Sequence, residues 1–196
     1  NKPYVDLRGS FSSLIPKQLN PKLRHKLLNY YLDKLKQFPF LHDKVEFEIL
    51  FTCYDVSIDL RLNELTKFNF SQNEILSIKK SLLIFTNQII ENFPKTSTYC
   101  KNSIQNLEKN RIQILDKLSN SKNYKQILDS AKFLLLDCQK FGTIPFSTMA
   151  RIAFIGSILL KSLHSIKAID SKYLDIFMKS ISTPLSEIQH DIIEYG

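Results

Sequence analysis

Glycine and proline are scarce in this chain, with four and seven occurrences in 196 residues. A many-stranded sandwich or barrel needs a turn residue after nearly every strand, so this composition disfavours such folds. The glycines, at positions 9, 142, 156 and 196, are also too far apart for a GxGxxG turn or a P-loop. Neither kind of nucleotide site is therefore expected in this chain alone.

Metal-binding patterns are absent as well. The three cysteines form no CxxC pair and no cysteine–histidine spacing suited to zinc, and the four histidines stand alone. We therefore predict no metal site, and reduced thiols as in a cytoplasmic protein. The longest apolar run, IAFIGSILL at 152–160, is too short to span a bilayer. The chain begins without methionine, so we expect it to be part of a longer protein.

The chain does have an excess of positive charge and many aromatic residues. A net charge of +8 accompanies 43% hydrophobic residues, with 14 Phe and 8 Tyr. This is enough apolar material for a folded core. The excess charge is mostly lysine spread over the polar faces of expected helices, without aromatic–basic interleaving or a recognition motif. We therefore expect a basic surface and no nucleic-acid site.

Helical periodicity covers most of the chain. Asn20 and Pro21 supply an N-cap and a first-turn proline for a helix over 20–38, and Ser71 with Glu74 forms a capping box. Further helices are predicted over about 71–93, 97–119, 123–140, 146–168 and 171–180, with another opened by Thr183 and Pro184. Gly142 should end the helix over 123–140, and the apolar helix over 146–168 should be central.

One segment alternates with a period of two instead. In HDKVEFEILFT, residues 42–52, apolar residues alternate with polar ones from Lys44 onward. That pattern predicts a half-buried strand over 45–51. The predicted fold is therefore mainly α: a single multi-helix domain over 1–196 with a small β element near its N-terminus.

The opening segment YVDLRGSFSSLIP, residues 4–16, carries the first candidate site residues. Its apolar content resembles that of a strand, yet Arg8 and three serines (Ser10, Ser12 and Ser13) lie at its centre. Arginine can present its planar fork to a carboxylate or phosphate, and small neighbours leave room for that ligand. The alternative is that Arg8 makes a structural ion pair with a nearby carboxylate.

Paired carboxylates and a second arginine complete the candidate set. Glu46 and Glu48 would share a strand face about 7 Å apart. Such a pair can hold an ammonium group, or act as a general base if one raises the pKa of the other. Arg151 opens the most apolar helix, where a cation needs an anion or a hydrogen-bond partner. Charged residues on an exposed strand, and a structural partner for Arg151, remain the alternatives.

Three segments carry a family resemblance: PYVDLRGSFSSLIP, LHDKVEFEILFTCYD and FGTIPFSTMARIAFIGSILLKSL. They resemble the region after the ATP-grasp domain in phosphoenolpyruvate-synthase-like, PEP-utilising proteins. Within that family they are most similar to the branch containing the L-glutamine kinases of capsular phosphoramidate biosynthesis. The similarity runs along nearly the whole chain but is vague from about 60 to 135.

The resemblance implies a division of labour. An ATP-grasp domain before this region would use ATP and Mg²⁺, and a swivelling domain after it would carry a phosphohistidine, with AMP and phosphate released. This chain would be the acceptor-binding domain, inactive alone and binding no cofactor itself. The implied acceptor is the side-chain amide of L-glutamine, with Arg8 or Arg151 for its carboxylate and Asp43, Glu46 or Glu48 as base or ammonium ligand. The alternative is a non-catalytic helical docking domain of an enzyme with a different small-molecule acceptor.

Overall fold

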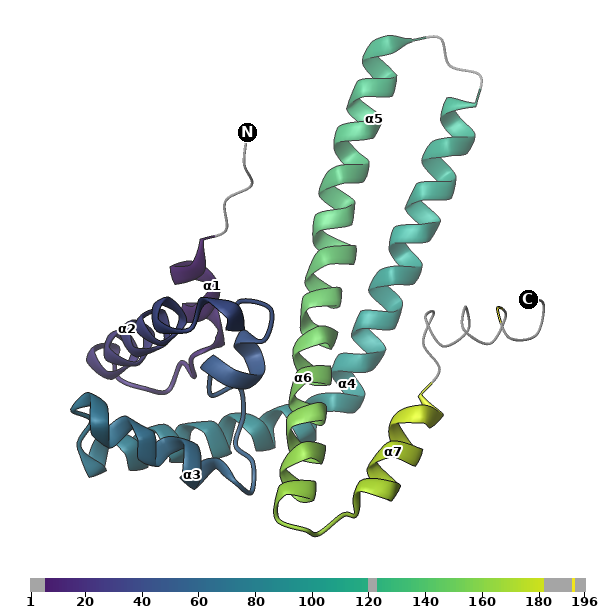
Figure 1. Ribbon diagram of the computed structural model, residues 1–196. Coiled ribbons are helices and arrows are strands. Elements are labelled where there is room, and N and C mark those ends of the chain that lie inside the picture. The colour runs from purple at the N-terminus through teal and green to yellow at the C-terminus, as the bar shows by residue number, and fades with distance from the viewer. Residues whose placement is uncertain (1–5, 120–122, 182–191, 193–196) are drawn as a thin grey trace.

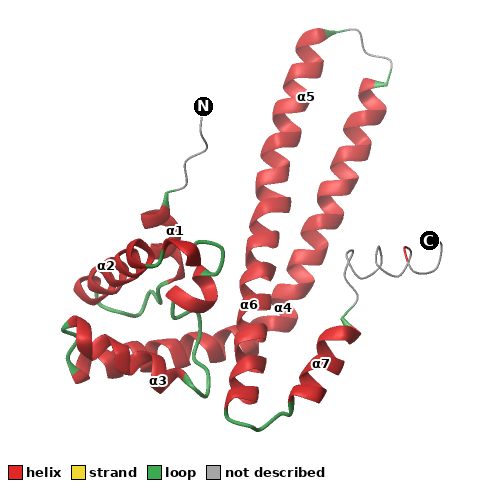
Figure 2. Cartoon of the chain, in the orientation of Figure 1, coloured by secondary structure: helices red, strands yellow, loops and turns green. Residues whose placement is uncertain are grey.

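The computed structural model describes residues 6–119, 123–181 and 192. The chain forms an N-terminal lobe of short helices, from which a long helical hairpin extends (Figure 1). In chain order the elements are α1 (Leu7–Leu14), α2 (Pro21–Gln37), η1 (Pro39–Leu41), η2 (Val45–Ile49), α3 (Ile58–Asn63), η3 (Glu64–Phe68), α4 (Gln72–Leu118), α5 (Tyr124–Asp137), η4 (Cys138–Thr143), α6 (Ile144–Ser165) and α7 (Ser171–Ser180). The described part is mainly α and contains no strand (Figure 2).

The hydrophobic core lies in the N-terminal lobe, between α2, the first half of α4 and the short elements that connect them. Its innermost side chains, at most 1% exposed, include Leu27, Tyr31, Ile49, Leu65 and Ile78. The Tyr31 hydroxyl also accepts a hydrogen bond from the Phe51 backbone N–H at 3.2 Å. The predicted start of α2 is confirmed, because Asn20 caps the Leu23 N–H at 2.8 Å and Pro21 follows.

The opening segment forms the helix α1, although its apolar content resembles that of a strand. Asp6 is the N-cap of α1 and accepts from the Gly9 N–H at 2.9 Å. A residue that caps a helix start in this way satisfies one of the free N–H groups of the first turn. The apolar residues then follow helical spacing, and Phe11 and Ile15 enter the core.

The predicted β element at 45–51 is also wrong. Val45–Ile49 forms the π-helical turn η2. All five residues from Ile49 to Cys53 are buried, including Leu50, which the alternation had placed on the polar face. A strand needs a partner to pair its backbone groups, and none exists among the described residues. Consecutive side chains are thus buried at the end of this turn and in the segment that follows it, in place of the one-sided burial of a strand.

Helix α4 is one helix where two were predicted. The capping box of Ser71 and Glu74 opens it as expected, with hydrogen bonds of 3.2 and 2.8 Å. It then continues through Pro94 to Leu118. Proline removes one backbone donor and bends a helix without necessarily ending it. Figure 1 shows α4 changing direction midway, so that its second half becomes one arm of the hairpin.

The other arm, α5–η4–α6, is also continuous, so Gly142 does not end a helix. Gly142 lies in the π-helical turn η4, where an added Cβ would be 3.3 Å from Leu107 Cδ2 of α4. Its missing side chain therefore allows the two arms to approach. The arm spans Tyr124–Ser165. It contains an apolar window of 18 residues with a mean hydropathy of 1.5, and 17% of that window is buried. By length and composition, this arm is long enough to cross a membrane, whereas the run at 152–160 is too short. Core helices of soluble proteins also meet this criterion.

The helix over 146–168, predicted to be central, is buried on one face only. Within α6, Ile155 and Ile158 are buried against Cys53 and partly buried residues of η2 and α4. Phe146, by contrast, is 73% exposed. The helix predicted over 171–180 is confirmed as α7. The predicted helix start at Thr183 and Pro184 lies outside the described residues.

Candidate functional site

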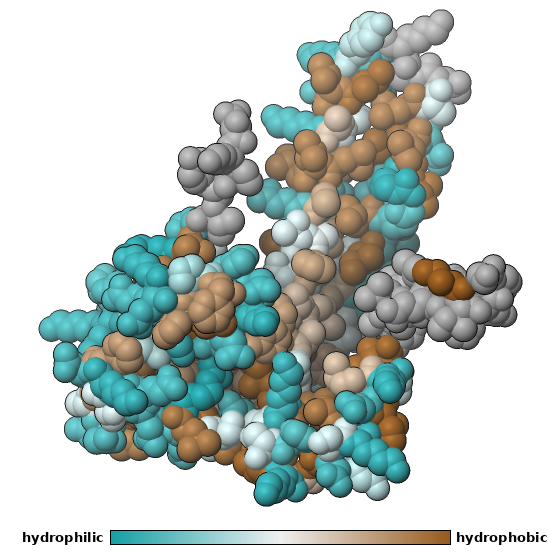
Figure 3. All heavy atoms as spheres, viewed as in Figure 1, coloured by the Kyte–Doolittle hydropathy of each residue, from teal (hydrophilic) through white to brown (hydrophobic). Residues whose placement is uncertain are grey.

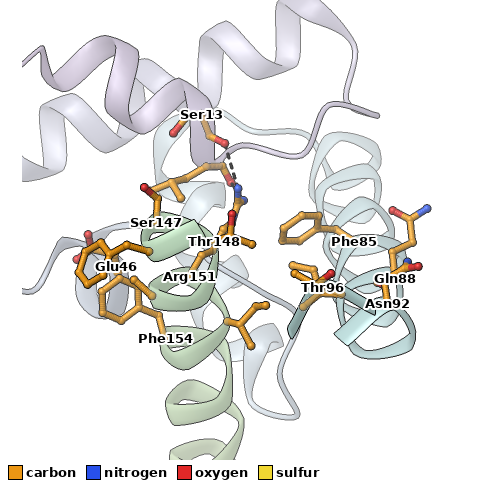
Figure 4. A pocket seen from close by; sticks show the side chains of 15 residues that line it. Ser13, Glu46, Phe85, Gln88, Asn92, Thr96, Ser147, Thr148, Arg151 and Phe154 are labelled. Carbon is orange, nitrogen blue, oxygen red and sulfur yellow. Dashed lines mark hydrogen bonds between the residues drawn. The ribbon is translucent and has the colours of Figure 1, made fainter. Parts of the chain in front are cut away.

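A cavity of about 800 Å³ lies where the N-terminal lobe meets the hairpin (Figure 4). The end of α1 contributes Ser13 and Leu14, and η2 contributes Glu46. The two arms contribute residues 85–96 of α4 and 146–154 of α6. Three of the predicted site residues, Ser13, Glu46 and Arg151, therefore line one cavity although they are far apart in sequence.

Arg151 lies at the centre of this cavity. Its Nη1 and Nη2 donate to the backbone oxygens of Ser13 at 3.3 Å and Leu14 at 3.2 Å, and the guanidinium lies 4.6 Å from the ring centroid of Phe85. Its Nε is buried without a protein partner in the described part of the chain. Burial lowers the pKa of the guanidinium from its usual value. The sequence predicted an anion or a hydrogen-bond partner for Arg151, with an Asp or Glu of the opening segments as the structural alternative; among the described residues, helix-end carbonyls are its hydrogen-bond partners.

These contacts suit the end of α1. The last carbonyls of a helix lack intrahelical donors, and a cation there also complements the helix dipole. Arg151 is thus partly structural, because it fixes the end of α1 against α6. Its remaining N–H donors are what a bound anion would require.

Replacing Arg151 with alanine should lower the free energy of unfolding by about 1–3 kcal/mol, because two carbonyls lose their donors. Urea denaturation measures this directly. Arg111→Ala, at an exposed residue paired with Glu108 on the same helix, is the matched control and should leave stability unchanged. Equal stability of the Arg151→Ala variant and wild type would show that water replaces these hydrogen bonds without loss.

Glu46 and Glu48 do not form the predicted pair on one face. Residues two apart on a helical turn point in different directions, and η2 directs Glu46 to the large cavity and Glu48 to a separate, smaller one. Among the described residues no ion pair reaches Glu46; its backbone oxygen accepts from the Thr52 hydroxyl at 2.5 Å. Glu46 alone is therefore available to a molecule in the large cavity.

The other predicted residues lie outside this cavity. Arg8 is exposed and approaches Asn29 Oδ1 of α2 at 3.5 Å, and Asp43 is exposed before η2. The Ser10 hydroxyl donates to the Asp6 backbone oxygen at 2.8 Å, and Ser12 lies half-buried in the same helix. Of the opening segment, only its last turn contributes to the cavity.

Sequence reasoning missed the α4 wall of the cavity. Gln88, Asn92 and Thr96 line it from successive turns, and Figure 4 shows them opposite Glu46 and Phe154. Their spacing of four residues was the available signal, since it places three polar side chains on one helix face. The resemblance is vague over this part of the chain, so it did not draw attention to them.

This arrangement combines a cation, a carboxylate and two amide side chains with apolar walls that include Phe85, Ile89 and Phe154. Small-molecule sites typically have this character: apolar walls, a few polar groups that orient the ligand, and volumes of about 300–1,000 Å³. The cavity is therefore suited to a small polar molecule with an anionic group.

Among the described residues, no set of side chains matches a metal site or a nucleotide phosphate site. In the described ranges no three His, Cys, Asp or Glu side chains gather at one place. The described glycines all lie within helices, none with positive φ, so they form no phosphate-binding loop.

Comparison with family models, with curated proteins and with solved structures finds no match. Membership of the PEP-synthase-like family accordingly stays a prediction from the three segments that carry the resemblance.

Proposed function

We propose that this chain binds the small-molecule acceptor of a multidomain phosphotransferase, with L-glutamine as the first candidate. One observation carries the proposal: the three segments that resemble the family converge on the large cavity. The first supplies Ser13, the second Glu46 and the third Arg151, while α4 adds the wall between them. Segments that share a ligand site are expected to meet in this way.

The chemistry of an amide acceptor fits this cavity. Arg151 would attract the α-carboxylate of glutamine, and the side chains of Gln88 and Asn92 would hydrogen-bond its other polar groups. An amide nitrogen is a poor nucleophile, so a base is needed as its bond to phosphorus forms. Glu46 would accept the amide proton, while the bond between phosphorus and a histidine on another domain breaks.

The wider role follows from the resemblance. ATP cleavage, with Mg²⁺, and histidine phosphorylation would take place on other domains of a cytoplasmic enzyme for capsular phosphoramidate synthesis. This chain alone would then bind acceptor without kinase activity.

Titration calorimetry of the chain with L-glutamine tests the proposal. Binding should be weakened in Ser147→Trp, because residue 147 is exposed and lines the cavity, so that the indole would occupy part of the space beside Arg151. Ala153→Trp, at an exposed position of α6 away from the cavity, is the matched control and should bind as wild type does. Absence of glutamine binding to wild type, or equal binding by both variants, would refute glutamine binding in this cavity.

A second function, docking of another protein domain, is favoured by the surface of the hairpin. Figure 3 shows hydrophobic residues gathered along both arms. They include Tyr99, Ile104, Leu128, Leu135 and Leu136, which are 54–73% exposed. Extended apolar surface of this kind usually marks an interface. If the chain is a docking domain, titration with L-glutamine should show no binding.

A further inference from the structure

A second, smaller cavity of about 200 Å³ lies between η2, the chain entering α3 and the C-terminal half of α6. Two carboxylates, Glu48 and Asp55, and two cations, Arg61 and Lys161, line it. Asp55 and Ser162 are buried and form its floor, whereas Glu48 and Lys161 are exposed at its rim. The cavity thus has equal numbers of acidic and basic side chains in its lining, next to the apolar Phe47 and Ile158.

Asp55 is the unusual residue in this cavity. Its side chain belongs to a residue only 1% exposed, and Oδ1 accepts from the backbone N–H and the hydroxyl of Ser57 at 2.8 and 2.6 Å. Oδ2 is buried and has no partner in the described part of the chain. A buried carboxylate oxygen without a donor is costly, so this oxygen requires a donor that the described protein atoms do not supply.

The neighbouring cations do not neutralise it. Arg61 donates through Nη2 to the Leu50 backbone oxygen at 2.7 Å and lies 5.3 Å from the Phe51 ring centroid. Lys161 Nζ lies 4.8 Å from the ring centroid of Phe47. Neither forms an ion pair with Asp55 within 4.0 Å in the described ranges. Both cations therefore keep charge available to an anionic group at the rim.

We propose that this cavity binds a small zwitterion of the α-amino-acid type. Its ammonium group would donate to Asp55 Oδ2 at the floor, and its carboxylate would meet Lys161 and Arg61. Equal numbers of acidic and basic side chains favour a ligand without net charge over a metal ion or a phosphate. The volume of about 200 Å³ leaves room for several water-sized groups, which favours small amino acids over large ones.

The site is separate from the large cavity. Phe47, which lines the small cavity, packs edge-to-face on Phe154, which lines the large one, with ring centroids 5.5 Å apart. The proposal therefore does not rest on the proposed function.

Calorimetry of the full chain with L-alanine tests it. L-alanine should bind, whereas N-acetyl-L-alanine, which lacks the ammonium group, and L-alaninamide, which lacks the carboxylate, should bind at least about tenfold more weakly. Asp55→Asn should weaken L-alanine binding by at least about tenfold. The matched control is Asp59→Asn, since Asp59 pairs with Lys79 on the surface and does not line the cavity.

Each of three results would overturn the proposal. The first is that L-alanine at about 10 mM, a concentration that also reveals dissociation constants above 1 mM, does not bind. The others are an unchanged dissociation constant in Asp55→Asn and equally tight binding of N-acetyl-L-alanine. Should Asp55→Asn fail to fold, Lys161→Gln at the exposed rim replaces it and must weaken L-alanine binding. Binding weakened in Ser147→Trp but kept in Asp55→Asn would place L-alanine in the large cavity, which refutes this proposal and leaves the proposed function intact.

Discussion

Replacing Glu46 with glutamine should lower kcat for phosphoryl transfer to the acceptor by about 10²–10⁴-fold in the complete enzyme, the usual contribution of a general base. The reason is that the glutamine side chain, nearly the same in shape, cannot accept the amide proton. KM for the acceptor should change much less, because the carboxylate acts on the reacting proton and Arg151 on the carboxylate of the ligand. The measurement is formation of the phosphorylated acceptor under saturating ATP.

The matched control for this variant is Glu91→Gln. Glu91 is an exposed carboxylate on α4, the helix that provides one wall of the cavity, and does not line the cavity. It should leave kcat at the wild-type value. A wild-type kcat in Glu46→Gln would mean that Glu46 is not the base and that the proton leaves to another group; Asp43, the next candidate from the sequence, lies outside the cavity.

Replacing Leu27 with alanine should lower the free energy of unfolding by about 2–5 kcal/mol, which is the range for removing a large buried aliphatic side chain. Leu27 is 0% exposed and belongs to the largest cluster of buried side chains. The loss combines transfer of the side chain from the core with the cavity left behind. Chemical denaturation followed by circular dichroism measures the change.

Leu60→Ala provides the comparison, because Leu60 is 75% exposed on α3. Its effect should stay within about 0.5 kcal/mol. If both variants lost the same free energy, the lobe around Leu27 would not be the stabilising core of this chain.

Local sequence signals predicted the starts of two helices correctly. Asn20 with Pro21 and Ser71 with Glu74 act over three or four residues of chain, so nothing distant is needed to read them. The helix over 171–180 was predicted in the same way. Boundaries set by contacts were not predictable: Pro94 bends α4 without ending it, and Gly142 serves the approach of Leu107 from the opposite arm.

For the candidate site, too, local features could be predicted and arrangements that depend on distant contacts could not. The candidate residues could be identified from the sequence, because an arginine in an apolar helix and two closely spaced glutamates are uncommon. Burying such charges without partners costs free energy. The structure decided that Arg151 and Glu46 share a cavity while Glu48 faces another. The alternation over 45–51 is too short to separate a strand from a single helical turn, and the structure distinguishes them: the Leu50 N–H donates to the Val45 backbone oxygen at 2.9 Å, as in a π-helical turn.

By itself, the sequence determined the mainly helical composition, the capped helix starts and the lack of a glycine-rich phosphate loop, since each depends on residues adjacent in the chain. Only the tertiary structure decided which helices continue past a proline or glycine, which polar residues of α4 face the cavity and where Asp55 Oδ2 has no donor among the described residues. These features depend on packing between residues that are distant in sequence, where the free energy of burial outweighs local preference.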